Sequence, residues 1–144
     1  QPAQRPHQMR DGNEDGEPAH QVPGESRVIG LHACADIQRG FAAEAWPAST
    51  RFAVRIGLHR GPAAPYRGTY IALAVHEAAR IAAGAHGGQV VVSDEVRRAT
   101  SPAPDGLRLV SLGEHMLKDF DEPVELHQLA GHGLDREFPP LRTL

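Results

Sequence analysis

Residues 70–93, YIALAVHEAARIAAGAHGGQVVVS, constrain the fold more than any other stretch of the chain. Their first part predicts an amphipathic helix from about Thr69 to Ala85, because apolar side chains recur along one stripe at Ile71, Val75, Ala78 and Ala82. His86-Gly87-Gly88 ends that helix, since glycine adopts positive φ without strain. The run QVVVS (89–93) is short and continuously apolar, which is typical of a strand covered on both faces.

Two further elements are expected before this unit. A helix is predicted from Ser26 to Ala45, with apolar residues at three- and four-residue steps and Trp46-Pro47 closing it. Residues 51–58 alternate apolar and other side chains, which indicates a strand with one buried face. The stretch GPAAPYRG (61–68) is expected to be a loop because of its glycine and proline content.

Three elements are expected after it. Ser93 suits the N-cap of a short helix over 94–100, with Asp94 and Glu95 in a first turn that favours negative charge. Two strands follow, over 107–113 and 124–130. This mixture of strands and helices predicts an α+β fold, with helices packed on a mainly antiparallel or mixed sheet.

Neither end of the chain shows the spacing of apolar residues that is typical of a helix or of a strand. Residues 1–24 are polar and rich in proline and glycine, so they are expected to form a disordered leader. Residues 131–144 are unpatterned and are expected to form a flexible tail. The length of 144 residues allows one domain, which these boundaries place at 25–130.

Composition excludes several classes of function. A net charge of −3 leaves no basic face for nucleic acid, and no apolar run is long enough to cross a membrane. The one cysteine, Cys34, fits a reducing cytoplasm and a small apolar position on a helix. Nine histidines occur without HxH or HExxH spacing, so histidine alone predicts no metal site.

Four motifs together resemble the C-terminal portion of the class III adenylate/guanylate cyclase catalytic domain: AWP (45–47), VRIGLHRG (54–61), AVHEAARIAAGAHGGQVVVS (74–93) and LGEHMLKDFDEPVELHQL (112–129). The resemblance covers roughly residues 26–130 and is greatest to bacterial versions. In those proteins a segment like FPPLRTL (138–144) often leads into an ATPase region and a DNA-binding regulator. It implies the ferredoxin-like α+β cyclase fold, here without the N-terminal part of the domain.

The resemblance also implies a reaction and a set of residues. Cyclases of this class convert ATP or GTP to a cyclic nucleotide and pyrophosphate with Mg²⁺ or Mn²⁺, in an active site shared between two subunits. The transition-state arginine corresponds to Arg80, the catalytic asparagine to His76 and the purine-selecting aspartate to Thr69. With Leu73, these residues would form one stripe at helical spacing. Two of the three polar groups therefore differ from the family's pattern.

The metal-binding half of the family's site is not recognisable. The strand that carries the first metal aspartate has no counterpart, and neither does the hairpin that carries the second and the purine-selecting lysine. Asp15, in GNEDGEP (12–18), is the nearest candidate, but it lies several residues too far upstream. The alternative for Asp15 is a solvated loop carboxylate.

Simpler interpretations remain open for the other polar residues. Arg80 is either a former active-site position or a surface arginine paired with Glu77, and His76 is either a phosphate donor or a neutral surface histidine. His59 suits a structural role at a strand end, and Lys118 a turn beside Asp119.

The leading hypothesis is a truncated, degenerate cyclase domain from cyclic-nucleotide signalling that is inactive alone. A homodimer would lack the same metal-binding half in both subunits. The alternatives are a regulatory module that pairs with an intact cyclase, contributing Arg80 in trans or blocking the partner's dimer face, and a fragment without function.

Overall fold

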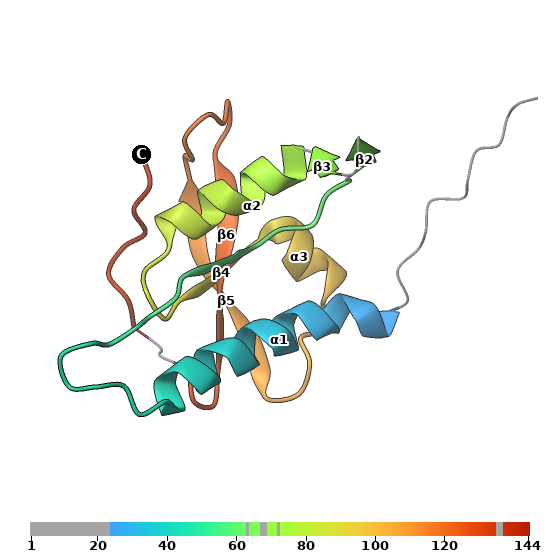
Figure 1. The fold of residues 1–144 in the computed structure, drawn as a ribbon. Helices are drawn as coiled ribbons and strands as arrows, with labels where there is room; N and C mark the ends of the chain where they lie inside the picture. The colour runs from blue at the N-terminus through green and yellow to red at the C-terminus, as the bar shows by residue number, and fades with distance from the viewer. Residues whose placement is uncertain (1–23, 63, 67–68, 72, 135–136) are drawn as a thin grey trace, which may run out of the picture.

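The computed structural model describes residues 24–62, 64–66, 69–71, 73–134 and 137–144, coloured along the chain in Figure 1. Expectations for residues 1–23, Asp15 included, lie outside the described residues. The elements follow in this order: α1 (Gly24–Ala43), β1 (Ile56–Leu58), β2 (Ala64–Tyr66), β3 (Thr69–Ile71), α2 (Leu73–Gly84), β4 (Val90–Ser93), α3 (Asp94–Ala99), β5 (Leu107–His115) and β6 (Val124–Gly131).

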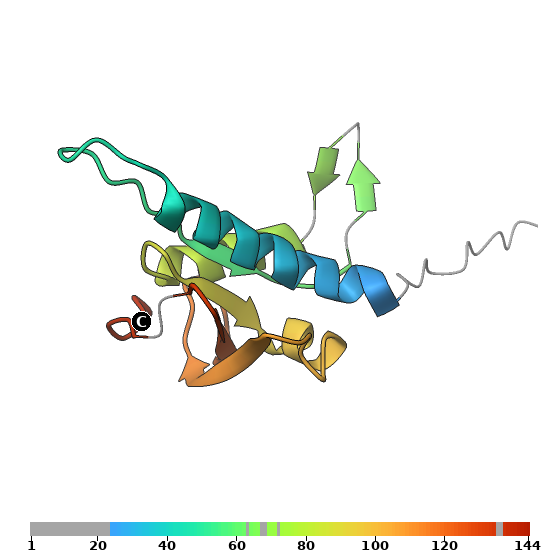
Figure 2. The same ribbon diagram turned by 90° about the horizontal axis from the view of Figure 1, so that it is seen from below.

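Four strands form one mixed sheet in the order β1-β4-β6-β5. The β1–β4 pair is parallel, while β4–β6 and β6–β5 are antiparallel. The expectation of a mainly antiparallel or mixed sheet in an α+β fold is therefore confirmed. Strands β2 and β3 form a separate antiparallel hairpin, which Figure 2 shows extending away from the body of the domain.

The main sheet has helices on both faces, because successive side chains of a strand point to opposite sides. Val90 and Val92 of β4 pack in one hydrophobic cluster with Leu31 and Ala35 of α1 and Val96 of α3. Val91, between them, packs in a second cluster with Ile81 and Ala85 of α2, Leu117 and Leu126. The continuous apolar run of β4 therefore serves two cores, as the sequence predicts. Cys34 of α1 is buried in the first cluster, and burial raises the pKa of its thiol.

Helix α2 crosses β1 at very short range. A Cβ added to Gly57 of β1 would lie 2.4 Å from the backbone nitrogen of Ala82 and 2.7 Å from the carbonyl oxygen of Ala78. Because no side chain fits there, the glycine of the VRIGLHRG motif sets the distance between helix and strand.

Three elements differ from the sequence-based expectation. Strand β1 has only three residues, Ile56–Leu58, although the segment before it stays attached to the domain. The carbonyl oxygen of Val54 accepts the backbone N–H of Gly88 and the side-chain amide of Gln38. Residues 64–66, expected in a loop, form β2. Helix α2 begins at Leu73 rather than Thr69, because residues 69–71 pair with β2 as a strand instead.

Residues 137–144 have no helix or strand, but they contact the domain at several points. The N–H of Arg142 donates to the carbonyl oxygen of Gly84, and the N–H of Leu144 to that of Met116. Leu141 packs against the second cluster. The segment therefore adds one apolar side chain to the covering of that cluster.

Candidate functional site

Arg80, at the transition-state position implied by the resemblance, lies in the second half of α2. Its guanidinium Nη2 donates to Oδ2 of Asp119 at 2.5 Å. Asp119 belongs to the connection between β5 and β6, and the two side chains are 37% and 62% exposed. Arg80 is therefore a surface arginine in an ion pair, but its partner is Asp119 and not Glu77.

The structure divides the expected stripe of Thr69, Leu73, His76 and Arg80 between two elements. His76 lies on α2 one turn before Arg80 and is exposed, and Leu73 begins that helix. Thr69 is in β3 of the projecting hairpin, so it is not on the helical face. A helical stripe joining all four residues is therefore wrong. The roles assigned to Thr69, His76 and Arg80 remain proposals.

Glu77 faces a different partner, His59, which follows β1. The buried His59 side chain contacts a Glu77 carboxylate oxygen through Nε2 and the Ser93 hydroxyl through Nδ1, at 2.9 Å. Glu95 lies farther away, with Oε2 at 3.9 Å from Nδ1. Ser93 Oγ also accepts the N–H of Val96 as the N-cap of α3. His59 thus joins β1, α2 and the start of α3, which agrees with a structural role at a strand end.

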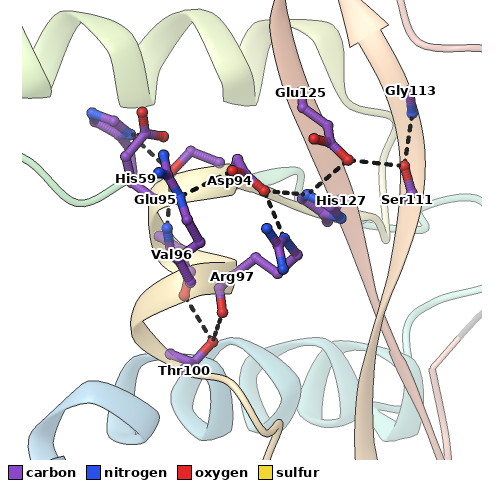
Figure 3. Close-up of polar contacts among 12 residues, drawn as sticks. His59, Asp94, Glu95, Val96, Arg97, Thr100, Ser111, Gly113, Glu125 and His127 are labelled. Carbon is purple, nitrogen blue, oxygen red and sulfur yellow. Dashed lines mark hydrogen bonds and ion pairs between the residues drawn. The ribbon is translucent and has the colours of Figure 1, made fainter.

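A second polar group joins α3 to β6, and Figure 3 shows its side chains converging. Asp94 Oδ1 lies 2.6 Å from Nε of Arg97 and 3.0 Å from Nε2 of His127. Its other oxygen, Oδ2, is 3.0 Å from Nε of Arg98. Glu125 Oε1 lies 3.6 Å from the same His127 nitrogen. His127 is only 3% exposed, so these contacts satisfy an imidazole that is removed from water.

The electrostatics of this group follow from its donors. The hydrogen bond from Arg97 holds the pKa of the Asp94 carboxyl below the usual 3.8, aided by the His127 hydrogen bond and the charges of Arg97 and Arg98, although burial opposes the shift. A carboxylate is an acceptor only, so His127 Nε2 carries the hydrogen toward Asp94.

Asp94, Glu125 and His127 are close enough to share a metal ion, since their ligand atoms all lie within 4.8 Å of one another. Their surroundings do not suit the Mg²⁺ or Mn²⁺ of a cyclase. Oδ1 of Asp94 already accepts a hydrogen bond from Arg97, and Oδ2 is ion-paired with Arg98. His127 Nε2 offers a hydrogen rather than a lone pair. Mg²⁺ needs several oxygen ligands in near-octahedral geometry. The group is therefore built as a neutralised ion-pair network, and Arg80 is in none of its contacts.

The spacing of the histidines does not reveal this group, because it contains a single histidine and two carboxylates. One sequence pattern does indicate part of it. Glu125 and His127 are two residues apart on the expected strand, so their side chains point to the same face of β6. The contribution of Asp94 comes from the antiparallel pairing of β4 with β6, in which Ser93 lies opposite Leu126.

Known proteins similar in sequence to this chain have no described function. No family model matches the chain. Uncharacterised proteins of Mycobacterium tuberculosis and Mycobacterium bovis are 35% identical over 124 residues, which is 85% of this chain and 41% of each relative. The chain thus spans less than half the length of these relatives.

Solved structures supply the fold. An adenylate/guanylate cyclase/hydrolase from Silicibacter pomeroyi superposes with a TM-score of 0.63 at 26% identity, over 74% of this chain and 63% of that chain. An adenylate cyclase from Trypanosoma brucei, in its monomeric state, gives 0.56 at 23% identity, over 83% and 65%. The adenylyl cyclase CyaB from P. aeruginosa gives 0.55 at 19% identity, over 90% and 67%.

The fold and these neighbours define an α+β domain of the cyclase type. The chain contains a domain with the adenylate/guanylate cyclase-like fold, which the four motifs also indicated. Among the helices that the structure describes, none combines the length and apolar character needed to cross a bilayer.

Proposed function

We propose that this chain is a degenerate class III cyclase homology domain that forms no cyclic nucleotide on its own. The observation that carries the proposal is that the charged groups a cyclase site needs are paired with one another among the described residues. Arg80 pairs with Asp119, and Asp94, in the group close enough to share an ion, pairs with Arg97 and Arg98. In cyclisation the 3′-oxygen attacks the α-phosphorus while pyrophosphate leaves, and negative charge develops on the phosphoryl oxygens. An arginine stabilises that charge only if its N–H groups are free to reach it. Here Nη2 of Arg80 is already hydrogen-bonded to a carboxylate at 2.5 Å.

The residue at the asparagine position supports the same proposal. His76 is exposed on α2, one turn from Arg80. A neutral imidazole has one N–H donor, while an asparagine amide has two and a carbonyl acceptor in addition. His76 can therefore hold one phosphate oxygen but cannot reproduce the contacts of the amide.

The proposal is tested by incubating the purified chain with MnATP and with MnGTP and measuring cyclic nucleotide, with an intact class III cyclase assayed in parallel. We expect no product above the buffer background, and the same result for Arg80→Ala. Product from the unmodified chain that is lost in Arg80→Ala but kept in Arg108→Ala, a change at an exposed arginine on β5, would overturn the proposal.

A second candidate function is an interaction module that pairs with an intact cyclase domain. The helix that carries Arg80 also carries two large exposed apolar residues, Leu73 at 71% and Val75 at 51%. Large exposed apolar side chains can mark interaction surfaces, and Leu73 lies at helical spacing from His76 and Arg80, on the face of α2 that carries them. A partner seated on α2 would meet Arg80 and His76, so the chain would either lend Arg80 or block the partner's own dimer face.

This second function is tested by titrating the chain into an active class III cyclase and following the rate. We expect the rate to change at saturating chain, and the effect to be lost in Leu73→Asp/Val75→Asp. Ile29→Asp is the matched control, because Ile29 is 60% exposed but lies on α1. An unchanged cyclase rate at every concentration of the chain counts against the interaction.

A further inference from the structure

Asp119 stands out by its backbone as well as by its contact with Arg80. Its φ is 67°, and among the described residues it is the only non-glycine residue with positive φ. Glycine adopts this conformation freely, whereas a side chain makes it costly, although aspartate tolerates it better than most residues. A carboxylate therefore occupies a backbone position that glycine would fill with less strain. The backbone conformation of the turn does not explain why the residue is an aspartate, whereas the contact of its carboxylate with Arg80 does.

The backbone around Asp119 is anchored on both sides. Leu117 is 3% exposed and belongs to the second hydrophobic cluster, together with Ile81 of α2, and Phe120 packs against that cluster. The N–H of Phe120 donates to the carbonyl oxygen of Leu117 at 3.2 Å, which closes the turn around Asp119. Arg80 precedes Ile81 in the chain, so both partners of the ion pair are next to residues of one core. Rotation of the Asp119 side chain is thus sufficient to separate the pair, without movement of the turn.

A carboxylate and a phosphoryl group present the same feature to a guanidinium, namely oxygen atoms that accept charge-assisted hydrogen bonds. We propose that Asp119 is an internal competitor for the anion-binding side of Arg80, so that a phosphate-bearing ligand binds there only when the Asp119 carboxylate turns away. This inference deepens the proposed function and rests on its assignment of Arg80 to a phosphate-facing position. It adds an autoinhibitory contact within the chain.

The expected strength of this competition is modest. Both side chains are partly exposed, and exposed ion pairs are weak because water and salt screen them. Release of Asp119 therefore corresponds to about a two- to fivefold gain in anion affinity. A contact of this strength weakens the binding of a simple anion severalfold, and a ligand with further contacts displaces it readily.

The test is binding of inorganic pyrophosphate to the purified chain, followed by isothermal titration calorimetry at low ionic strength. We expect Asp119→Asn and Asp119→Gly to bind pyrophosphate about two- to fivefold more tightly than the unmodified chain. Asp119→Gly suits the positive φ, so it is expected to fold normally. The matched control is Asp121→Asn, which removes an equal charge from the same exposed connection.

The double variant Arg80→Ala/Asp119→Asn is expected to lose the gain. An equal gain in Asp121→Asn, a gain that persists without Arg80, or no measurable pyrophosphate binding by any variant would each overturn the inference. These outcomes are separate from the test of the proposed function. Cyclic nucleotide formation by the unmodified chain would contradict the proposed lack of cyclase activity. The pyrophosphate affinities alone test the role of Asp119.

Discussion

The imidazole Nε2 of His127 lies 3.0 Å from Oδ1 of Asp94, which ties β6 to the first turn of α3. The two residues are 33 positions apart, and His127 is nearly inaccessible to water. Arg97 and Arg98 hold the same carboxylate from within α3. The contact therefore depends on Asp94 being ionised, which makes it sensitive to acid.

The first prediction concerns that sensitivity. The pKa of Asp94 is lowered below 3.8 in the folded chain, so the unfolded chain binds a proton more readily. The stabilisation is therefore complete above pH 3.8 and is lost as pH falls through that value toward the lower folded pKa. We expect the free-energy difference of unfolding between the unmodified chain and Asp94→Asn, measured with urea, to be largest near pH 7 and to shrink near pH 3.

Asp105→Asn serves as the control, since Asp105 is exposed. Its difference from the unmodified chain is expected to stay small across the same range. A difference for Asp94→Asn that does not change between pH 7 and pH 3 would contradict a role for the ionised carboxylate.

The second prediction concerns the close approach of α2 and β1. Gly57→Ala places a methyl group 2.4 Å from a backbone atom of Ala82, and backbone cannot rotate away as a side chain can. We expect unfolding free energy to fall by about 3 kcal/mol or more. Gly40→Ala is the matched control, because nothing lies within 4 Å of its added Cβ on α1. That change should stabilise the chain by about 0.5–1 kcal/mol. Equal midpoints in urea for the two variants would refute the close contact.

Much of the fold follows from local sequence pattern. The buried run QVVVS, the two-glycine stop and the Ser93 N-cap each depend on a few neighbouring residues, and the structure has β4, a positive φ at Gly88 and α3 in those places. The boundaries of α2 were not readable in this way. Ile71 continues the helical spacing of the apolar residues of α2, but residues 69–71 pair with β2 instead. The hairpin supplies backbone hydrogen bonds that the first turn of a helix would lack.

Less of the candidate site could be read from sequence. Arg80 could be placed from a motif, but Asp119 is 39 residues away and meets it only after β5 and β6 pair. Under the alternative of a surface arginine, Glu77 would be the partner of Arg80 because it is one turn away, yet Glu77 contacts His59 instead. Contacts between distant surface residues depend on the packing of whole elements, and periodicity carries no information about them.

The third prediction concerns His59. His59→Ala leaves the buried Ser93 hydroxyl without its imidazole partner and removes the link to Glu77. We expect a loss of about 1–3 kcal/mol in unfolding free energy, because unsatisfied polar groups within a protein are costly. His76→Ala, an exposed change on α2, should alter stability by less than about 0.5 kcal/mol. Similar losses for the two histidines would show that burial of His59 does not determine its contribution.

The fourth prediction concerns the C-terminal segment. Leu141 packs against the cluster formed by Ile81, Val91 and Leu126, and the segment is fixed by the backbone hydrogen bond from Arg142 to Gly84. Leu141→Ala should reduce unfolding free energy by about 1–2 kcal/mol, less than for a fully buried leucine because Leu141 is only partly buried. Leu144→Ala provides the control, since that side chain is 85% exposed, and it should change stability by less than about 0.5 kcal/mol.

Hydrogen exchange of the Arg142 amide gives a second measurement. Protection close to that of α2 is expected if the segment is part of the domain, whereas exchange at the rate of a free peptide would mean that the segment does not cover the cluster.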